Sequence, residues 1–214
     1  MGWKRHSEPV ISRNESYLMK SDKLKRLMDI SIASVLLIIL LPVFLLVMFL
    51  IMTTMGRPVF FSHQRSGFKK EAFFLFKFRT MREKHGENIK DSERITPLGL
   101  FLRKYSIDEI PQLLNVILGH MSLVGPRPLL REYDSLYSDI QNQRFLVKPG
   151  ITGLAQISGR NDINWNEKLS FDVEYVRSRT IRLDFMILLK TVTVVFAAKG
   201  FHPSGEASKF GAEE

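Results

Sequence analysis

Two adjacent carboxylates, Asp108 and Glu109, are the strongest candidates for chemistry in this sequence. They lie in residues 106–113, SIDEIPQL. Neighbouring carboxylates at the start of a helix can bind a divalent cation through oxygen and leave one oxygen free to attack phosphorus. A structural interpretation is also open, because Ser106 followed by Glu109 is a capping-box pattern and the helix dipole favours acids in the first turn.

Two loops carry arginines in settings suited to phosphate. In residues 125–128, GPRP, a proline on each side of Arg127 restricts the backbone and holds that residue extended. A stiff loop that presents a guanidinium suits bidentate recognition of phosphate. Residues 148–160, KPGITGLAQISGR, contain three glycines that allow close backbone approach to a ligand, and they end at Arg160. Both loops also have the composition of ordinary connections.

The elements that must position these residues are short and of mixed type. The alternation of Phe74, Phe76 and Phe78 with Leu75, Lys77 and Arg79 predicts a half-buried strand with Lys77 and Arg79 side by side on its polar face. Helical spacing follows in residues 98–105 and 111–118. The sequence therefore predicts a small α/β domain.

A further helix is predicted over residues 165–177. It is preceded by Asn164, with Glu167 three residues later, which is a capping-box signature. Asp172 and Glu174 lie on this helix. Their pattern is typical of a solvated helix face, and a binding site is the alternative.

A long apolar run precedes this domain. Residues 30–52 are about 23 uncharged residues, or roughly 35 Å as a helix, which is a membrane length. Pro42 interrupts the run, and its two halves are each too short to cross a bilayer core. Both flanks are basic, which places both ends on the cytoplasmic side. We therefore expect a re-entrant helix hairpin broken at Pro42; a straight span and a buried core helix are the alternatives.

These patterns divide the chain into four parts. Residues 1–22 form a polar, loosely ordered N-terminal extension, 23–56 the membrane hairpin, 57–200 the catalytic domain and 201–214 a C-terminal tail. Within the domain, residues 182–199 are amphipathic, which indicates an interfacial helix, with an ordinary core helix as the alternative.

Composition limits the function classes. The chain has 214 residues, a formal net charge of +9 and no cysteine, and its five histidines are scattered. The charge indicates an anionic partner: nucleic acid, acidic lipid or a phosphorylated substrate. The absence of cysteine excludes disulfides and thiolate catalysis. Nucleic-acid binding would not explain a carboxylate pair beside a membrane hairpin, so we expect no nucleic-acid partner. Carboxylates, isolated arginines and a membrane segment together favour phosphoryl transfer at a bilayer surface.

Five motifs in order make the sequence resemble a known family. They are KRLMDI at 25–30, KFRTM at 77–81, LRKYSIDEIPQLLNV at 102–116, GHMSLVGPRPLL at 119–130 and KPGITGLAQISGRN at 148–161. The sequence resembles the monotopic phosphoglycosyl transferases, also called the bacterial sugar transferase family, in their minimal form. The resemblance covers residues 24–214. It departs at Leu41, where many members have serine before the proline.

The resemblance implies a fold and a set of site residues. A re-entrant hairpin and interfacial helices would seat the α/β catalytic domain on the cytoplasmic face of the bacterial inner membrane. Asp108 matches the nucleophile and Glu109 its dyad partner, with Mg²⁺ held by both. The other implied residues are basic positions that bind the substrate phosphates, Lys77, Arg79, Arg103, Arg127 and Arg160, and the pocket candidates Gln156 and Asp172. Arg160 and Asp172 match polar positions that line the nucleotide-sugar pocket.

The implied reaction has two steps. Asp108 attacks the β-phosphorus of a UDP-sugar and releases UMP, and undecaprenyl phosphate then displaces the carboxylate. The product is a polyprenyl diphosphate sugar, which downstream glycosyltransferases would extend in glycoconjugate biosynthesis. Residues 200–210, which include SGEAS, resemble those of members that act on N-acetylated amino sugars. Oligomeric state is left open.

Overall fold

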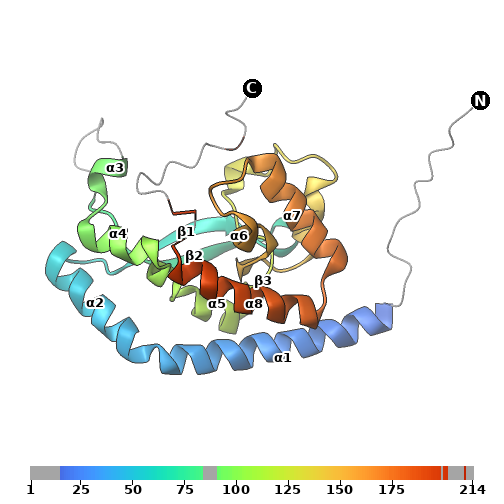
Figure 1. Ribbon diagram of the computed structural model, residues 1–214, viewed down its shortest axis with the longest axis horizontal. Coiled ribbons are helices and arrows are strands. Elements are labelled where there is room, and N and C mark those ends of the chain that lie inside the picture. Colours follow the sequence, from blue (N-terminus) through green and yellow to red (C-terminus); the bar gives the residue numbers. More distant parts are fainter. Residues whose placement is uncertain (1–14, 84–90, 199, 202–209, 211–214) are drawn as a thin grey trace, which may run out of the picture.

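A long bent pair of helices runs beneath the rest of the molecule (Figure 1). It consists of α1 (Glu15–Ile39) and α2 (Leu41–Met55), which meet at a bend of 60°. The structure is a computed structural model that describes residues 15–83, 91–198, 200–201 and 210. Helix α1 already begins at Glu15, so the predicted loose extension is wrong for residues 15–22, and residues 1–14 lie outside the described residues.

The bend lies at Leu40, two residues before the predicted position. Proline lacks an N–H and its ring crowds the carbonyl four residues earlier, here Ile38, whereas a first helical turn tolerates it. The chain therefore bends first, and Pro42 falls in the first turn of α2. No single described helix is long and apolar enough to cross a membrane; residues 22–39 and 41–55 meet that test only as a bent pair. The helix break is confirmed, and the re-entrant path stays a prediction.

Polar side chains fasten α1 to the domain above it. The Lys25 ammonium lies 2.6 Å from Asp184. Arg26 donates to the carbonyl oxygens of Val116 and Ile117 at 2.6 and 3.0 Å. These residues lie at the end of α5 (Gln112–Leu118), where carbonyls lack intrahelical partners. The KRLMDI motif thus acts as a joint between the bent pair and the domain.

The domain combines two small sheets with short helices. Strands β1 (Phe60–Ser66) and β2 (Ala72–Phe78) are antiparallel, and β3 (Ser122–Val124) is parallel to β4 (Gly150–Thr152). The helices are α3 (Asp91–Arg94), α4 (Pro97–Lys104), α5 (Gln112–Leu118), α6 (Leu154–Ser158), α7 (Trp165–Ser178) and α8 (Ile181–Phe196). Short 3₁₀ helices are η1 (Phe68–Lys70), η2 (Ile107–Glu109), η3 (Arg131–Tyr133) and η4 (Gln141–Leu146). The mixed α/β prediction is confirmed, and Asn164 and Glu167 form the predicted capping box.

The predicted faces of β2 are wrong in part. Phe73 and Leu75 are buried, whereas Phe74 is 53% exposed. Because side chains alternate along a strand, Lys77 shares the inward face with Phe73 and Leu75. The buried Asn115 side chain bonds the backbone of Phe74 and Phe76 at 2.7 and 3.0 Å along the free edge of β2. This register turns Lys77 toward the interior.

The bent pair is packed on one side only. Ala33 of α1 joins the main core, and Val47 and Ile51 of α2 form a second core with Phe78 and Leu102. The opposite side carries exposed apolar residues: Val35, Ile38, Ile39, Leu45, Leu46 and Phe49. The alternative of a buried core helix is therefore wrong for this segment.

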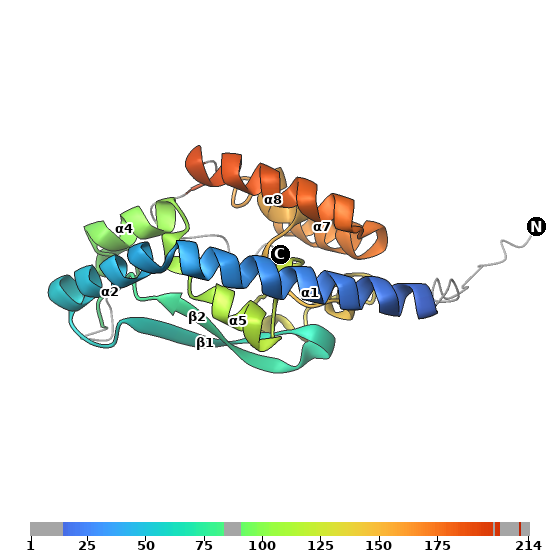
Figure 2. The ribbon, with the colours of Figure 1, turned by 90° about the horizontal axis from the view of Figure 1, so that it is seen from below.

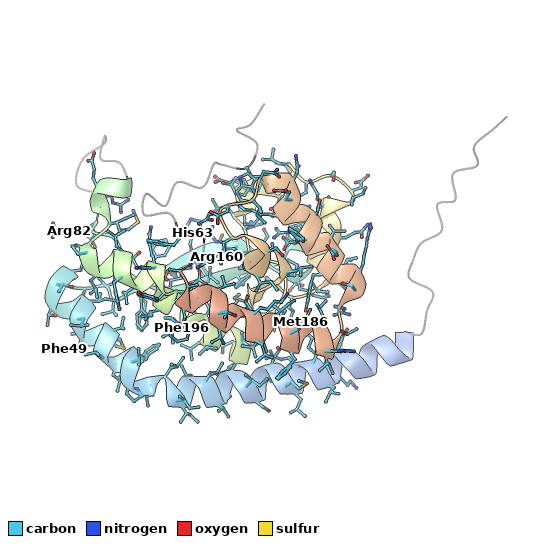
Figure 3. The ribbon with its side chains drawn as sticks, viewed as in Figure 1. Phe49, His63, Arg82, Arg160, Met186 and Phe196 are labelled. Carbon is cyan, nitrogen blue, oxygen red and sulfur yellow. The ribbon has the colours of Figure 1, made fainter. Side chains whose placement is uncertain are left out.

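Helix α8 lies beside α1 and has a similar outer face (Figure 2). Asp184 and Ile187 are its buried residues. Its exposed apolar residues are Phe185, Met186, Leu189, Val192 and Phe196, of which Figure 3 labels Met186 and Phe196 near opposite ends of the helix. The predicted amphipathic character is confirmed.

Candidate functional site

The carboxylate pair lies on η2, the single turn between α4 and α5. Ser106, which precedes it, has a φ of 54° and makes no capping bond. The capping-box interpretation of Ser106 and Glu109 is therefore wrong. Asp108 and Glu109 are both buried, so each charge requires compensation from nearby groups.

Two cations from different elements meet at Glu109. Its Oε1 accepts hydrogen bonds from Lys77 Nζ of β2 and from Arg127 Nη2 of the Pro-Arg-Pro loop, both at 2.7 Å. Lys77 Nζ is also 3.7 Å from Asp108 Oδ2. Lys77 therefore bridges the two carboxylates, which follows from its inward position on β2.

The pKa values of the two carboxyls are displaced in opposite directions. Burial raises the pKa of Asp108 above its usual range; Lys77 opposes this shift, and the charge on Glu109 adds to it. Burial acts on Glu109 in the same sense, but Arg127 and Lys77 outweigh it and hold the pKa of that carboxyl well below its usual range. Glu109 is thus the more acidic of the two carboxyls, and Asp108 is the more basic one.

Arg144 fixes the backbone of the Arg127 loop. Its buried guanidinium donates to the carbonyl oxygen of Arg127 at 2.6 Å and forms an ion pair with Asp172 at 2.9 Å. Asp172 is therefore not on a solvated face, so that interpretation is wrong, and its role in a pocket stays a prediction. Arg144 was missed, because nothing in its local sequence indicates a buried ion pair with a residue 28 positions away.

A cavity of about 220 Å³ opens on the Glu109 side of the pair. Arg127, Gln156 and Arg160 line it with Glu109. Arg160, labelled in Figure 3, donates to Ser106 Oγ at 2.8 Å. The cavity thus brings together three of the predicted binding residues.

The two remaining arginines have different positions. Arg103 donates from Nε to Thr80 Oγ1 at 2.9 Å, and its charge acts on Asp108. Arg79 is buried at the end of α2, where its guanidinium donates to the carbonyl oxygens of Met55, Gly56 and Arg57. Arg79 therefore joins β2 to the bent pair and is not brought to the carboxylates, because β2 ends at Phe78.

The protein groups supply only part of a metal site. Among the described residues, no three His, Cys, Asp or Glu side chains gather in a geometry that could hold a metal ion. Mg²⁺ commonly binds through one or two carboxylates and completes its shell with substrate phosphates and water. Asp108 and Glu109 fit such a site when a diphosphate provides the other oxygens.

Known proteins resemble this chain over most of its length. The model of the family described as bacterial sugar transferase matches residues 20–198. The chain belongs to the bacterial sugar transferase family. It is 45% identical to the uncharacterized sugar transferase EpsL of Bacillus subtilis, over 86% of this chain and 93% of that protein. It is 38% identical to the exopolysaccharide production protein ExoY of Rhizobium meliloti, over 82% of this chain and 87% of the relative.

A third relative of this sugar transferase is longer. The undecaprenyl-phosphate galactose phosphotransferase of Salmonella typhimurium is 36% identical over 90% of this chain, but the match spans only 45% of that protein.

The Asp172 and Arg144 pair gives a stability prediction. Asp172→Asn should destabilise this sugar transferase by about 3–5 kcal/mol, because it leaves the buried Arg144 charge without its partner. Glu174→Gln, on the exposed side of the same helix, should change stability by less than about 0.5 kcal/mol. Thermal unfolding in detergent micelles measures both. Equal midpoints for the two variants would contradict the positioning role.

Proposed function

We propose that this protein transfers a sugar 1-phosphate from a UDP-sugar to undecaprenyl phosphate and releases UMP, as the first membrane step in making an exopolysaccharide or related glycan. The observation that carries the proposal is the buried Asp108 and Glu109 pair with Lys77 and Arg127 bound to it. The names of relatives support it. One, from Xanthomonas campestris, is a UDP-glucose:undecaprenyl-phosphate glucose-1-phosphate transferase, 38% identical over 82% of this chain and 39% of that protein.

In the first step a carboxylate oxygen of Asp108 forms a bond to the β-phosphorus of the donor. The bond from that phosphorus to the bridging oxygen breaks, and UMP leaves with the electron pair. In the second step a phosphate oxygen of the lipid attacks the same phosphorus, and the Asp108 carboxylate is released unchanged. Negative charge spreads over the phosphoryl oxygens in both transition states, and Lys77, Arg103 and Arg127 are placed to stabilise it.

Glu109 would hold these cations in position. Because Lys77 and Arg127 keep it ionised, it fixes two donors beside Asp108 before any substrate arrives. Positioned charges of this kind need no reorganisation during the reaction. Glu109 also offers a second oxygen ligand to a metal.

The identity of the transferred sugar can be determined by comparing UDP-sugar donors. The expected N-acetylated amino sugar rests on residues 204–208, which lie outside the described residues, whereas the Salmonella and Xanthomonas relatives are named for galactose and glucose. A panel of UDP-galactose, UDP-glucose and UDP-N-acetylamino sugars, with UMP release as the readout, distinguishes these donors.

Covalent phosphorylation of Asp108 is the central prediction. With UDP-sugar and no lipid, the wild-type protein should release one UMP per active site and gain the mass of a sugar phosphate on Asp108. Asp108→Asn should remove both signals, because an amide is not an anionic nucleophile. Asp139→Asn, at an exposed position, is the control and should behave as wild type. UMP release that requires lipid, without an adduct, would instead indicate direct displacement.

Magnesium dependence is the second prediction. Chelation with EDTA should abolish adduct formation, and Mg²⁺ should restore it, because the two carboxylates and a diphosphate offer the hard oxygen ligands that this ion prefers. Equilibrium binding of Mn²⁺, a paramagnetic substitute, should require both the protein and UDP-sugar and should weaken in Glu109→Gln. Full activity after thorough chelation would exclude the metal.

The membrane placement generates a third prediction. We propose that the exposed apolar faces of α1, α2 and α8 enter one leaflet and that both ends of the bent pair stay cytoplasmic. Helix α2 spans only about 22 Å, less than a hydrocarbon core of about 30 Å. Since the chain has no cysteine, single cysteines at Lys23 and Lys69 can be labelled in sealed vesicles. They should react from the same side, and labelling from opposite sides would contradict the re-entrant path.

A further inference from the structure

The cavity beside Glu109 also has a wall formed by the helices that carry the exposed apolar faces. Leu36 and Leu40 of α1 line it at the bend, and Thr191, Val194 and Val195 of α8 line it across the seam between the two helices. The cavity therefore extends from the carboxylate pair to the side of the molecule where α1 and α8 lie next to each other.

The lining divides into a charged end and an apolar end. Glu109, Arg127 and Arg160 form the charged end together with Ser106. Apart from Tyr105 and the polar Thr152, Gln156 and Thr191, the rest is aliphatic: Leu36, Leu40, Ile110, Leu113, Ile151, Ile157, Val194 and Val195. Two guanidinium groups beside an aliphatic wall complement a ligand with an anionic head and a hydrocarbon tail.

The Gln156 side chain adds a further polar group to the lining. Both its amide oxygen and its amide nitrogen are buried, and no described protein group bonds either atom. An unpaired buried donor or acceptor typically costs about 1–3 kcal/mol. A phosphate oxygen of a ligand would accept from the amide nitrogen, and a protonated oxygen would donate to the amide oxygen.

The volume restricts how much of such a ligand can enter. Sites for small molecules typically enclose roughly 300–1,000 Å³, whereas this cavity encloses about 220 Å³. A whole polyprenyl chain does not fit. The head and the first units of its tail would be enclosed, and the remainder would continue along the exposed apolar residues of α1 and α8.

We propose that this cavity is the subsite for the lipid acceptor: it binds the phosphate and the first isoprenoid units of polyprenyl phosphate on the Glu109 side of the pair. Arg127 lines the cavity, bonds Glu109 at 2.7 Å and also acts on Asp108, so a phosphate bound by Arg127 lies next to the carboxylate pair. The assignment rests on the proposed function, because that function supplies the identity of the acceptor.

The test fills the apolar end with a bulky side chain. Val194→Trp should raise the KM for polyprenyl phosphate by at least about 10-fold, because losing even one or two methylene contacts in such a pocket has that effect. Release of UMP from UDP-sugar without lipid should stay at the wild-type level. Thr193→Trp, at the neighbouring exposed position of α8, is the matched control and should leave both values unchanged.

A binding measurement separates this inference from the reaction itself. Native mass spectrometry with farnesyl phosphate should show one bound molecule in the wild type and in Thr193→Trp, and loss of it in Val194→Trp. Farnesol, which lacks the phosphate, should bind at least about 10-fold more weakly. Binding in this pattern without turnover on any UDP-sugar would support the subsite and contradict the proposed function.

Photocrosslinking of the unmodified protein guards against misfolding of the variant. A polyprenyl phosphate that carries a diazirine on its first isoprenoid unit should label Ile110, Ile157 or Val194. Labelling confined to α2 or to the outer face of α8 would overturn the proposal. Loss of lipid-independent UMP release in a folded Val194→Trp would also overturn it, because the cavity would then belong to the donor.

Discussion

The site depends on one electrostatic arrangement, the neutralisation of Glu109 by Lys77 and Arg127 in a buried setting. Two neighbouring carboxylates would repel each other and would be costly to desolvate without cations. Hydrogen bonds at 2.7 Å from both cations stabilise the ionised form of Glu109, whereas the pKa of Asp108 stays raised by burial. The opposite pKa shifts of two adjacent residues follow from this arrangement, because the cations bond one carboxyl directly and approach the other less closely.

Each cation is held by elements remote from η2. Lys77 is directed inward by the register of β2, which the Asn115 side chain secures along one edge. Arg127 is held through its carbonyl by Arg144, whose charge is balanced by Asp172 of α7. The geometry at Asp108 therefore depends on β2, α5 and α7, and a substitution on any of them can alter it without contacting substrate.

The sequence was sufficient for the carboxylate pair, the Pro-Arg-Pro loop, the helix break and the capped helix α7, because each is a local pattern. Prediction from the sequence failed where the position of a side chain depends on a partner that is distant in the sequence. The alternating pattern placed Arg79 on the same strand face as Lys77. Strand β2 ends at Phe78, however, and Arg79 bonds backbone carbonyls at the end of α2. Asp172 was assigned to a solvated face because its partner, Arg144, is remote in sequence. The bend lies at Leu40 and not at Pro42, because a proline disrupts the helical turn that precedes it.

The same cores join the apolar helices and the catalytic residues. Ala33 of α1 packs in the cluster that contains Leu75 and Leu113, so the segment bearing the exposed apolar face is continuous with the layer that holds η2. Two basic residues of α1 add polar contacts: Arg26 bonds the end of α5, and Lys25 pairs with Asp184 of α8. A displacement of α1 would consequently move α5 and α8 and alter the cavity between them. A lipid held along α1 and α8 would thus have its phosphate brought to Arg127 and Arg160 by the packing of the fold.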